Sequence, residues 1–66
     1  MKVVITDIHS TDGYVDDKVV GLVGSMEFEG PYSQDYPYGY VQGSFTEVIT
    51  NRTYYFYAIK VKSLED

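Results

Sequence analysis

The segment Lys18–Glu29, which reads KVVGLVGSMEFE, carries the clearest pattern in the chain. One parity of this segment is apolar or glycine: Val20, Leu22, Gly24, Met26 and Phe28. A period of two places such side chains on one face of a strand. A helix is disfavoured because Gly21 and Gly24 would each cost about 1 kcal/mol relative to alanine. We therefore expect a strand over Lys18–Glu29, with a bulge or bend at Gly24 on its inner face.

Four other segments complete the predicted set of strands: Lys2–Ile8, Tyr38–Ile49, Thr53–Tyr57 and Val61–Leu64. The first and third are rich in β-branched and aromatic residues, which are enriched in strands. In the second, Val41, Phe45 and Ile49 fall on one face. The parity of the alternation breaks at Ala58–Lys60, before the last short strand.

The segments between these strands have the composition of loops and turns. His9–Asp17 reads HSTDGYVDD, and Gly30–Pro37 contains two prolines and a glycine. Thr50–Arg52 separates two strands and is expected to be a turn. No helical period is present, and the chain of 66 residues is long enough for one domain, residues 1–66.

Five short strands about ten residues apart predict an all-β fold. Both parities carry apolar side chains, so an open sheet would leave apolar surface in water. Curling the sheet buries more of that surface and removes free edges. We therefore expect a small, strongly bent five-stranded barrel.

The order of these elements resembles the SH3-like barrel. His9–Asp17 lies where such barrels carry their RT loop, and Val20–Gly24 is similar to the glycine-containing second strand of KOW-like modules. Tyr54–Val61 resembles the fourth strand, a single 3₁₀ turn and the fifth strand, with the turn at Ala58–Lys60. The chain looks more like the short acidic SH3-like proteins encoded in bacterial and phage genomes. The chain departs from the SH3 domains that bind PxxP ligands, because it lacks tryptophan and an ALYDY-type segment. The resemblance implies a fold and no particular activity.

Composition and charge exclude several classes of protein. With 44% hydrophobic and 17% aromatic residues, the chain is too apolar to be disordered. Ten acidic residues against five basic ones give a net charge of −5, which disfavours binding to nucleic acids and to anionic membranes. No cysteine is present, so disulfides and thiolate zinc sites are excluded. Met1–Asp7 becomes acidic before a signal-peptide core forms, and we expect a cytoplasmic protein.

Acidic residues gather near the N-terminus around the only histidine, His9; they are Asp7, Asp12, Asp16 and Asp17. The spacing fails as an EF-hand: with Gly13 at loop position 6, positions 1 and 12 are occupied by Ile8 and Val19. We interpret this segment as a solvated acidic loop, and the sequence leaves open whether it binds a cation. No catalytic motif is present. We expect no enzyme activity, no catalytic or metal-ligating residue, and no cofactor.

Eight tyrosines are more than a core of this size can hold, because buried hydroxyls need hydrogen-bond partners. If Phe56 points inward, Tyr55 and Tyr57 point outward. Tyr40 is expected to be a cross-strand neighbour of Tyr55, across the hairpin that turns at Thr50–Arg52. The predicted binding face with its acidic rim consists of Tyr14, Tyr32, Tyr36, Tyr38, Tyr40, Tyr55, Tyr57, Asp16, Asp17 and Glu29, with Asp12 and Asp35 as further rim residues.

These features predict a non-enzymatic protein–protein interaction module. The acidic rim suits a partner segment that bears Arg or Lys. The tyrosines are also consistent with a purely structural role, in which they stack over a half-exposed pair of strands. Two functional alternatives remain. One is an acidic mimic of nucleic acid that inhibits a host enzyme, of mobile-element or phage origin. The other is a homo-oligomeric structural piece that pairs through Lys2–Ile8 or through the tyrosine face.

Overall fold

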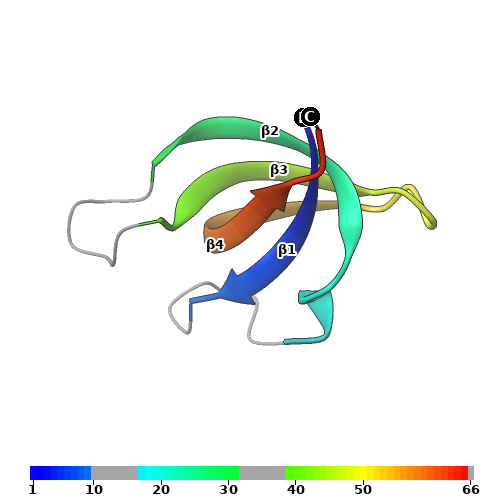
Figure 1. Cartoon of the computed structure of the whole chain (residues 1–66), viewed down its shortest axis with the longest axis horizontal. Coiled ribbons are helices and arrows are strands. Elements are labelled where there is room, and N and C mark those ends of the chain that lie inside the picture. The colour runs from blue at the N-terminus through cyan, green and yellow to red at the C-terminus, as the bar shows by residue number, and fades with distance from the viewer. Residues whose placement is uncertain (10–16, 32–38, 66) are drawn as a thin grey trace.

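The computed structural model describes residues 1–9, 17–31 and 39–65 of the chain. Its elements in chain order are β1 (Lys2–Ile8), the 3₁₀ turn η1 (Asp17–Val19), β2 (Val23–Pro31), β3 (Val41–Glu47) and β4 (Thr53–Ser63). Each strand is antiparallel to its neighbours, and β4 pairs back with β1, so the four strands form a closed ring (Figure 1). The all-β prediction is therefore confirmed.

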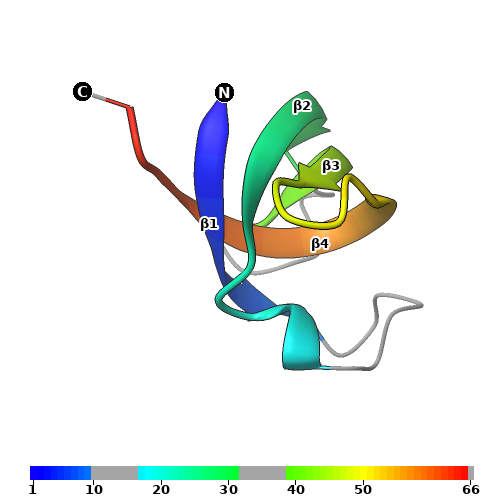
Figure 2. The ribbon, with the colours of Figure 1, turned by 90° about the vertical axis from the view of Figure 1, so that its right-hand side faces the viewer.

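The ring closes through β4, which is long enough to have two partners. Its first half pairs with β3, from Thr53 to Ile59, and its second half pairs with β1, from Ile59 to Ser63. Figure 2 shows β4 passing behind β1 and on toward β3. The predicted fifth strand and the 3₁₀ turn at residues 58–60 are not seen, because β4 continues without a break.

A bulge accounts for the parity break that the sequence shows. Between the pairs Val41↔Ile59 and Gly43↔Phe56, β3 contributes one residue and β4 contributes two. The extra residue shifts the alternation, so that Ala58 and Ile59 are both buried. A bulge also bends a strand and increases its twist, which lets β4 pass from β3 to β1 while it keeps its hydrogen-bond ladder.

The start of β2 differs from the prediction. The chain forms η1 at Asp17–Val19, and β2 begins only at Val23. Gly21, with φ of +96°, allows the turn between the two elements, in a conformation that other residues adopt only with strain. As a result Val19 is buried and Val20 is exposed, the reverse of the expected parity.

The core lies inside the ring, and its buried members are Val3, Ile5, Val19, Met26, Phe45, Phe56 and Ile59. Gly24 faces this core, but it is not the predicted bulge. A Cβ there would lie 2.2 Å from the carbonyl oxygen of Thr46 and 2.7 Å from Cζ of Phe45. Glycine at this position therefore permits a close approach of β2 to β3. The bulge in β2 lies between Phe28 and Gly30.

Two side chains that the alternation placed in the core are on the surface. Phe28 is 43% exposed, near the end of β2. Ile49 is 88% exposed because β3 ends at Glu47, two residues earlier than predicted, and the chain then turns toward β4. In Figure 1 this turn is the yellow loop at the right-hand end of the molecule.

Candidate interaction face

The outer face of β2, β3 and β4 carries a row of polar and tyrosine side chains. Glu27 of β2 pairs with Ser44 of β3, and Ser44 pairs with Tyr55 of β4. Tyr55 is 39% exposed and Tyr57 is 50% exposed, whereas Phe56 between them is buried. The prediction that these two tyrosines point away from the core is confirmed. We call Tyr55, Tyr57, Glu27, Glu29 and Gln42 the tyrosine face.

Contacts within the tyrosine face hold the two rings in place. The Tyr55 and Tyr57 rings pack edge to face, with centroids 5.1 Å apart and planes at 72°. Gln42 donates a hydrogen bond from Nε2 to the Tyr55 hydroxyl oxygen, at 2.9 Å. These contacts reduce the rotamer freedom that either ring would lose on binding a partner.

Glu29 lies close enough to the Tyr55 hydroxyl to change its acidity. The Gln42 hydrogen bond lowers the pKa of Tyr55, but three effects outweigh it: a hydrogen bond with Glu29, partial burial, and the negative charges of Glu29 and Tyr57. The pKa of Tyr55 therefore lies above its ordinary value of 10.0. The phenol is neutral at pH 7 and remains a hydrogen-bond donor.

Tyr40 does not join this face. Its hydroxyl donates to Oδ2 of Asp7 at 2.9 Å, its ring meets His9 edge to face at 5.1 Å, and Nζ of Lys60 lies 4.9 Å from the ring centroid. The predicted pairing with Tyr55 is wrong, because the cross-strand neighbour of Tyr55 is Ser44.

The position of β3 explains why Tyr40 lies elsewhere. β3 begins at Val41, which pairs with Ile59 beside the end of β1, so Tyr40 is placed near Asp7 and His9. The pKa of Tyr40 is raised first by its hydrogen bond to Asp7, then by burial and by the charge of Asp7.

Several predicted site residues lie outside the described residues: Tyr14, Tyr32, Tyr36, Tyr38, Asp12, Asp16 and Asp35. Asp17 is described only through its backbone, as the first residue of η1. Of the four clustered carboxylates, Asp7 is engaged by the Tyr40 hydroxyl and by the backbone N–H of Ile8. Within residues 1–9, 17–31 and 39–65, no three His, Asp or Glu side chains are arranged to hold a metal ion.

Sequence reasoning missed Glu47, a carboxylate that is buried at the end of β3. It accepts hydrogen bonds from the backbone N–H groups of Ile49 and Thr50 and from the Thr50 hydroxyl. The first of these bonds is the largest cause of a lowered Glu47 pKa. An acid followed by a turn with Thr and Asn was the available signal, because carboxylates satisfy N–H groups in turns.

Comparison with known proteins adds no family: no family model matches the chain, and the searches found no similar curated protein and no similar solved structure. Among the described residues, no helix is long and apolar enough to cross a membrane.

Proposed function

We propose that this chain is a non-enzymatic protein–protein interaction module that binds its partner through the tyrosine face. The observation that carries the proposal is the Tyr55–Tyr57 pair, two large side chains that are both exposed and held in place. Tyrosine offers a wide, rigid contact area with a polar hydroxyl, and it is enriched where proteins bind one another. The SH3-like scaffold is part of this proposal and rests on the sequence motifs.

The charges around the face favour a basic partner segment. Glu27 and Glu29 stand on β2 beside the tyrosines, in a chain with a net charge of −5. An Arg or Lys side chain can lie on a tyrosine ring while the nearby carboxylates attract it. The same chemistry occurs inside this chain, where Cζ of Arg52 lies 5.7 Å from the Tyr54 ring centroid.

The acidic mimic of nucleic acid has less support from the described carboxylates. Such a mimic needs a continuous row of charges. Asp7 is engaged by Tyr40, Glu47 caps a turn, and Glu65 accepts a hydrogen bond from the backbone of Lys2. In the described parts of the chain, the acids that share an outer face are the two of the tyrosine face, Glu27 and Glu29.

An affinity pull-down from lysate of the native host tests the proposal. The tagged chain is compared with Tyr55→Ala, Tyr57→Ala and the control Val20→Ser, which alters an exposed apolar residue outside the tyrosine face. We expect one stoichiometric partner that survives nuclease and high salt and is kept by the control. A central tyrosine contributes at least about 2 kcal/mol, so each tyrosine variant should bind about thirtyfold more weakly.

Two outcomes would contradict the proposal. A partner that binds both tyrosine variants as tightly as the wild type would remove the tyrosine face from the interface. A nucleic-acid enzyme that is released by salt and displaced by DNA would favour the mimic instead. Circular dichroism of each variant establishes that a loss of binding is not a loss of fold.

A further inference from the structure

A second surface lies on the outer side of the ring, at the opposite end of β2 from Glu29, and it combines exposed apolar side chains with a pocket. Val4 of β1 pairs with Val23 of β2, and the carbonyl of Val23 accepts a hydrogen bond from the backbone N–H of Val48 at 3.0 Å. Val3, which precedes Val4, and Gly24, which follows Val23, both face the core. Because side chains alternate along a strand, Val4 and Val23 face outward. Ile49 follows Val48 in the turn between β3 and β4.

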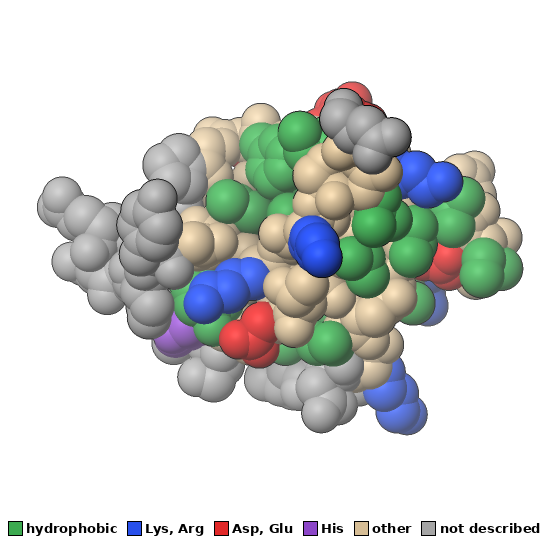
Figure 3. All heavy atoms as spheres, viewed as in Figure 1, with side chains coloured by type: hydrophobic (Ala, Val, Ile, Leu, Met, Phe, Trp, Pro, Cys, Tyr) green, Lys and Arg blue, Asp and Glu red, His purple; other side chains and the backbone are tan. Residues whose placement is uncertain are grey.

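The tip of the hairpin forms a rigid apolar knob. Val48 is 61% exposed and Ile49 is 88% exposed. The Glu47 carboxylate accepts hydrogen bonds from the Ile49 backbone N–H and the Thr50 hydroxyl within the turn. The backbone N–H of Asn51 donates to the Glu47 carbonyl at 2.9 Å. In Figure 3 hydrophobic side chains gather toward the right-hand end, where the hairpin lies, with basic side chains beside them. A turn held in this way presents Ile49 with little further loss of conformational entropy.

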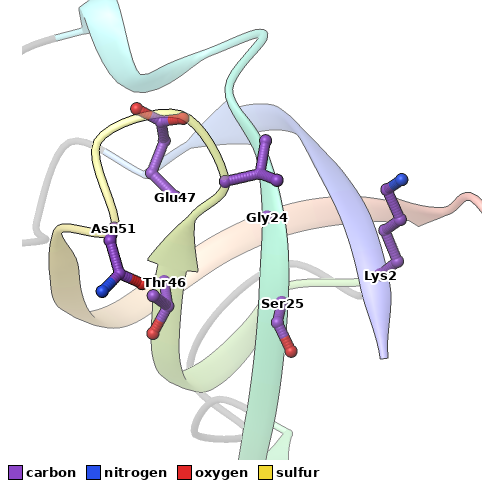
Figure 4. Close-up of a pocket in the computed structure, with 7 residues that line it drawn as sticks. Lys2, Gly24, Ser25, Thr46, Glu47 and Asn51 are labelled. Atoms are coloured by element: carbon purple, nitrogen blue, oxygen red, sulfur yellow. The ribbon is translucent and has the colours of Figure 1, made fainter.

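A pocket, which we also call the hole, lies beside Val48 and Ile49, the knob. This pocket of about 380 Å³ is lined by Lys2, Gly24, Ser25, Thr46, Glu47, Val48 and Asn51. Figure 4 shows Ser25 on the central strand, with Thr46 and Asn51 on one side and Lys2 on the other. This volume exceeds that of a single aliphatic side chain. Because Val48 forms one wall of the pocket, the knob and the hole share one face of the molecule.

We infer that this face binds a second copy of the same chain, with Ile49 of each copy inserted into the pocket of the other. A two-fold dimer requires a surface that is complementary to itself. A projecting apolar residue beside a pocket on the same face meets this requirement, because one rotation brings each knob to the opposite hole. The inference does not depend on the tyrosine face.

The charges on this face permit two acidic chains to meet. Lys2 lies at the edge of the pocket, and Lys62 pairs with Val4 in the adjacent strand. Glu65 is beside them, with Oε2 accepting from the backbone N–H of Lys2 at 2.9 Å. A surface with both signs can place a cation of one copy near a carboxylate of the other. Lys2 and Lys62 thus reduce, at this face, the repulsion between two chains that each have a net charge of −5.

The dimer leaves the tyrosine face available. Along β2, Glu27 is two residues beyond Ser25, the nearest pocket residue on that strand, a separation of about 7 Å at about 3.3 Å per residue. Ser25 and Thr46 belong to the pocket, whereas Tyr55 lies on β4, two residues beyond Thr53, the partner of Thr46. A dimer therefore presents two tyrosine faces, and a partner with two binding segments gains avidity from it.

The small area of the face indicates a weak, concentration-dependent dimer. A stable interface covers about 800 Å² on each partner, which is nearly one fifth of the 4440 Å² surface of this chain. The knob and pocket form a smaller contact, so we expect a dissociation constant of about 10 µM to 1 mM. Sedimentation of the full chain over that concentration range should show a monomer–dimer equilibrium.

Three substitutions identify the surface. Ile49→Ser removes the knob, and Ser25→Tyr fills the hole; both positions are exposed, so the fold should persist. We expect both variants to stay monomeric over the whole range. Tyr57→Ser, on the tyrosine face, should dimerise like the wild type. A wild type that is monomeric throughout overturns the inference, as does a dimer that survives Ile49→Ser or is lost in Tyr57→Ser.

A cross-link tests the predicted contact directly, since the chain has no cysteine of its own. Ile49→Cys mixed with Ser25→Cys should form a disulfide-linked pair under oxidising conditions, because knob and hole meet between copies. Ile49→Cys mixed with Tyr57→Cys is the matched control and should link at least tenfold more slowly. Equal rates in the two mixtures would place the contact elsewhere.

Discussion

Gly24→Ala tests how closely β2 approaches β3. A Cβ at this position would lie 2.2 Å from the carbonyl oxygen of Thr46, whereas ordinary contact begins at 3.4 Å. The oxygen would have to retreat by about 1.2 Å, although it belongs to the backbone of a strand that is paired on both sides. The ring of Phe45, 2.7 Å away, would also have to move.

The expected cost is a large share of the total stability. Overpacking a core by one methyl group costs about 1–3 kcal/mol, and a clash with paired backbone belongs at the upper end of that range. A core of this size supplies only about 3–5 kcal/mol. With a urea dependence of about 1 kcal/mol per M, a loss of about 3 kcal/mol lowers the unfolding midpoint by about 3 M. Far-UV circular dichroism in a urea series measures this shift.

Gly21→Ala is the matched control for this experiment. Gly21 has a positive φ of +96°, but nothing lies within 4 Å of the added Cβ. This variant should lose only about 1 kcal/mol of stability, because alanine is strained in a left-handed conformation. If Gly24→Ala is as stable as the wild type, or no less stable than Gly21→Ala, the close approach of β2 to β3 is not what requires glycine.

The remaining predictions concern titratable groups. The pKa of Glu47 is lowered in the folded state, so the unfolded chain binds more protons in acid, and the stability from this group is lost as the pH falls below its ordinary value of 4.5. The urea midpoint of the wild type should therefore fall between pH 7 and pH 3, and this fall should be smaller in Glu47→Gln. If the variant shows the same pH dependence as the wild type, the role of the carboxylate in the turn is contradicted. Asp7 raises the pKa of Tyr40 above 10.0. In an alkaline titration followed by tyrosine absorbance, Asp7→Asn should bring one late-titrating tyrosine back toward 10.0, and a profile identical to the wild type would argue against the hydrogen bond.

The two proposed surfaces lie on the outer side of one ring and differ in chemistry along β2. Val23 lies at the apolar end, and Glu27 and Glu29 lie at the acidic end. The self-association alternative raised by the sequence named Lys2–Ile8 or the tyrosine face as the contact. Our proposal instead uses the hairpin tip with its pocket, because an exposed aliphatic side chain, Ile49, lies next to Val48, which lines the pocket.

The sequence by itself determined the all-β class and the inward or outward direction of several side chains. β-Branched and aromatic residues with a period of two set the location of β1, with the predicted bounds Lys2–Ile8. In β4, Phe56 is buried and Tyr55 and Tyr57 are exposed. These features depend only on local alternation, because one covered face is enough to orient every second side chain.

Only the tertiary structure decided which strands are continuous and which side chains meet. The parity break at residues 58–60 is consistent with a turn or with a bulge, and the pairing of β4 with both β3 and β1 selects the bulge. Tyr40 meets Asp7 instead of Tyr55 because the register of β3 places it beside the end of β1. Glu47 and the pocket depend on the turn geometry and on contacts between distant segments. Alternation along one strand carries no information about the register of its neighbours, so these features became visible only when the ring closed.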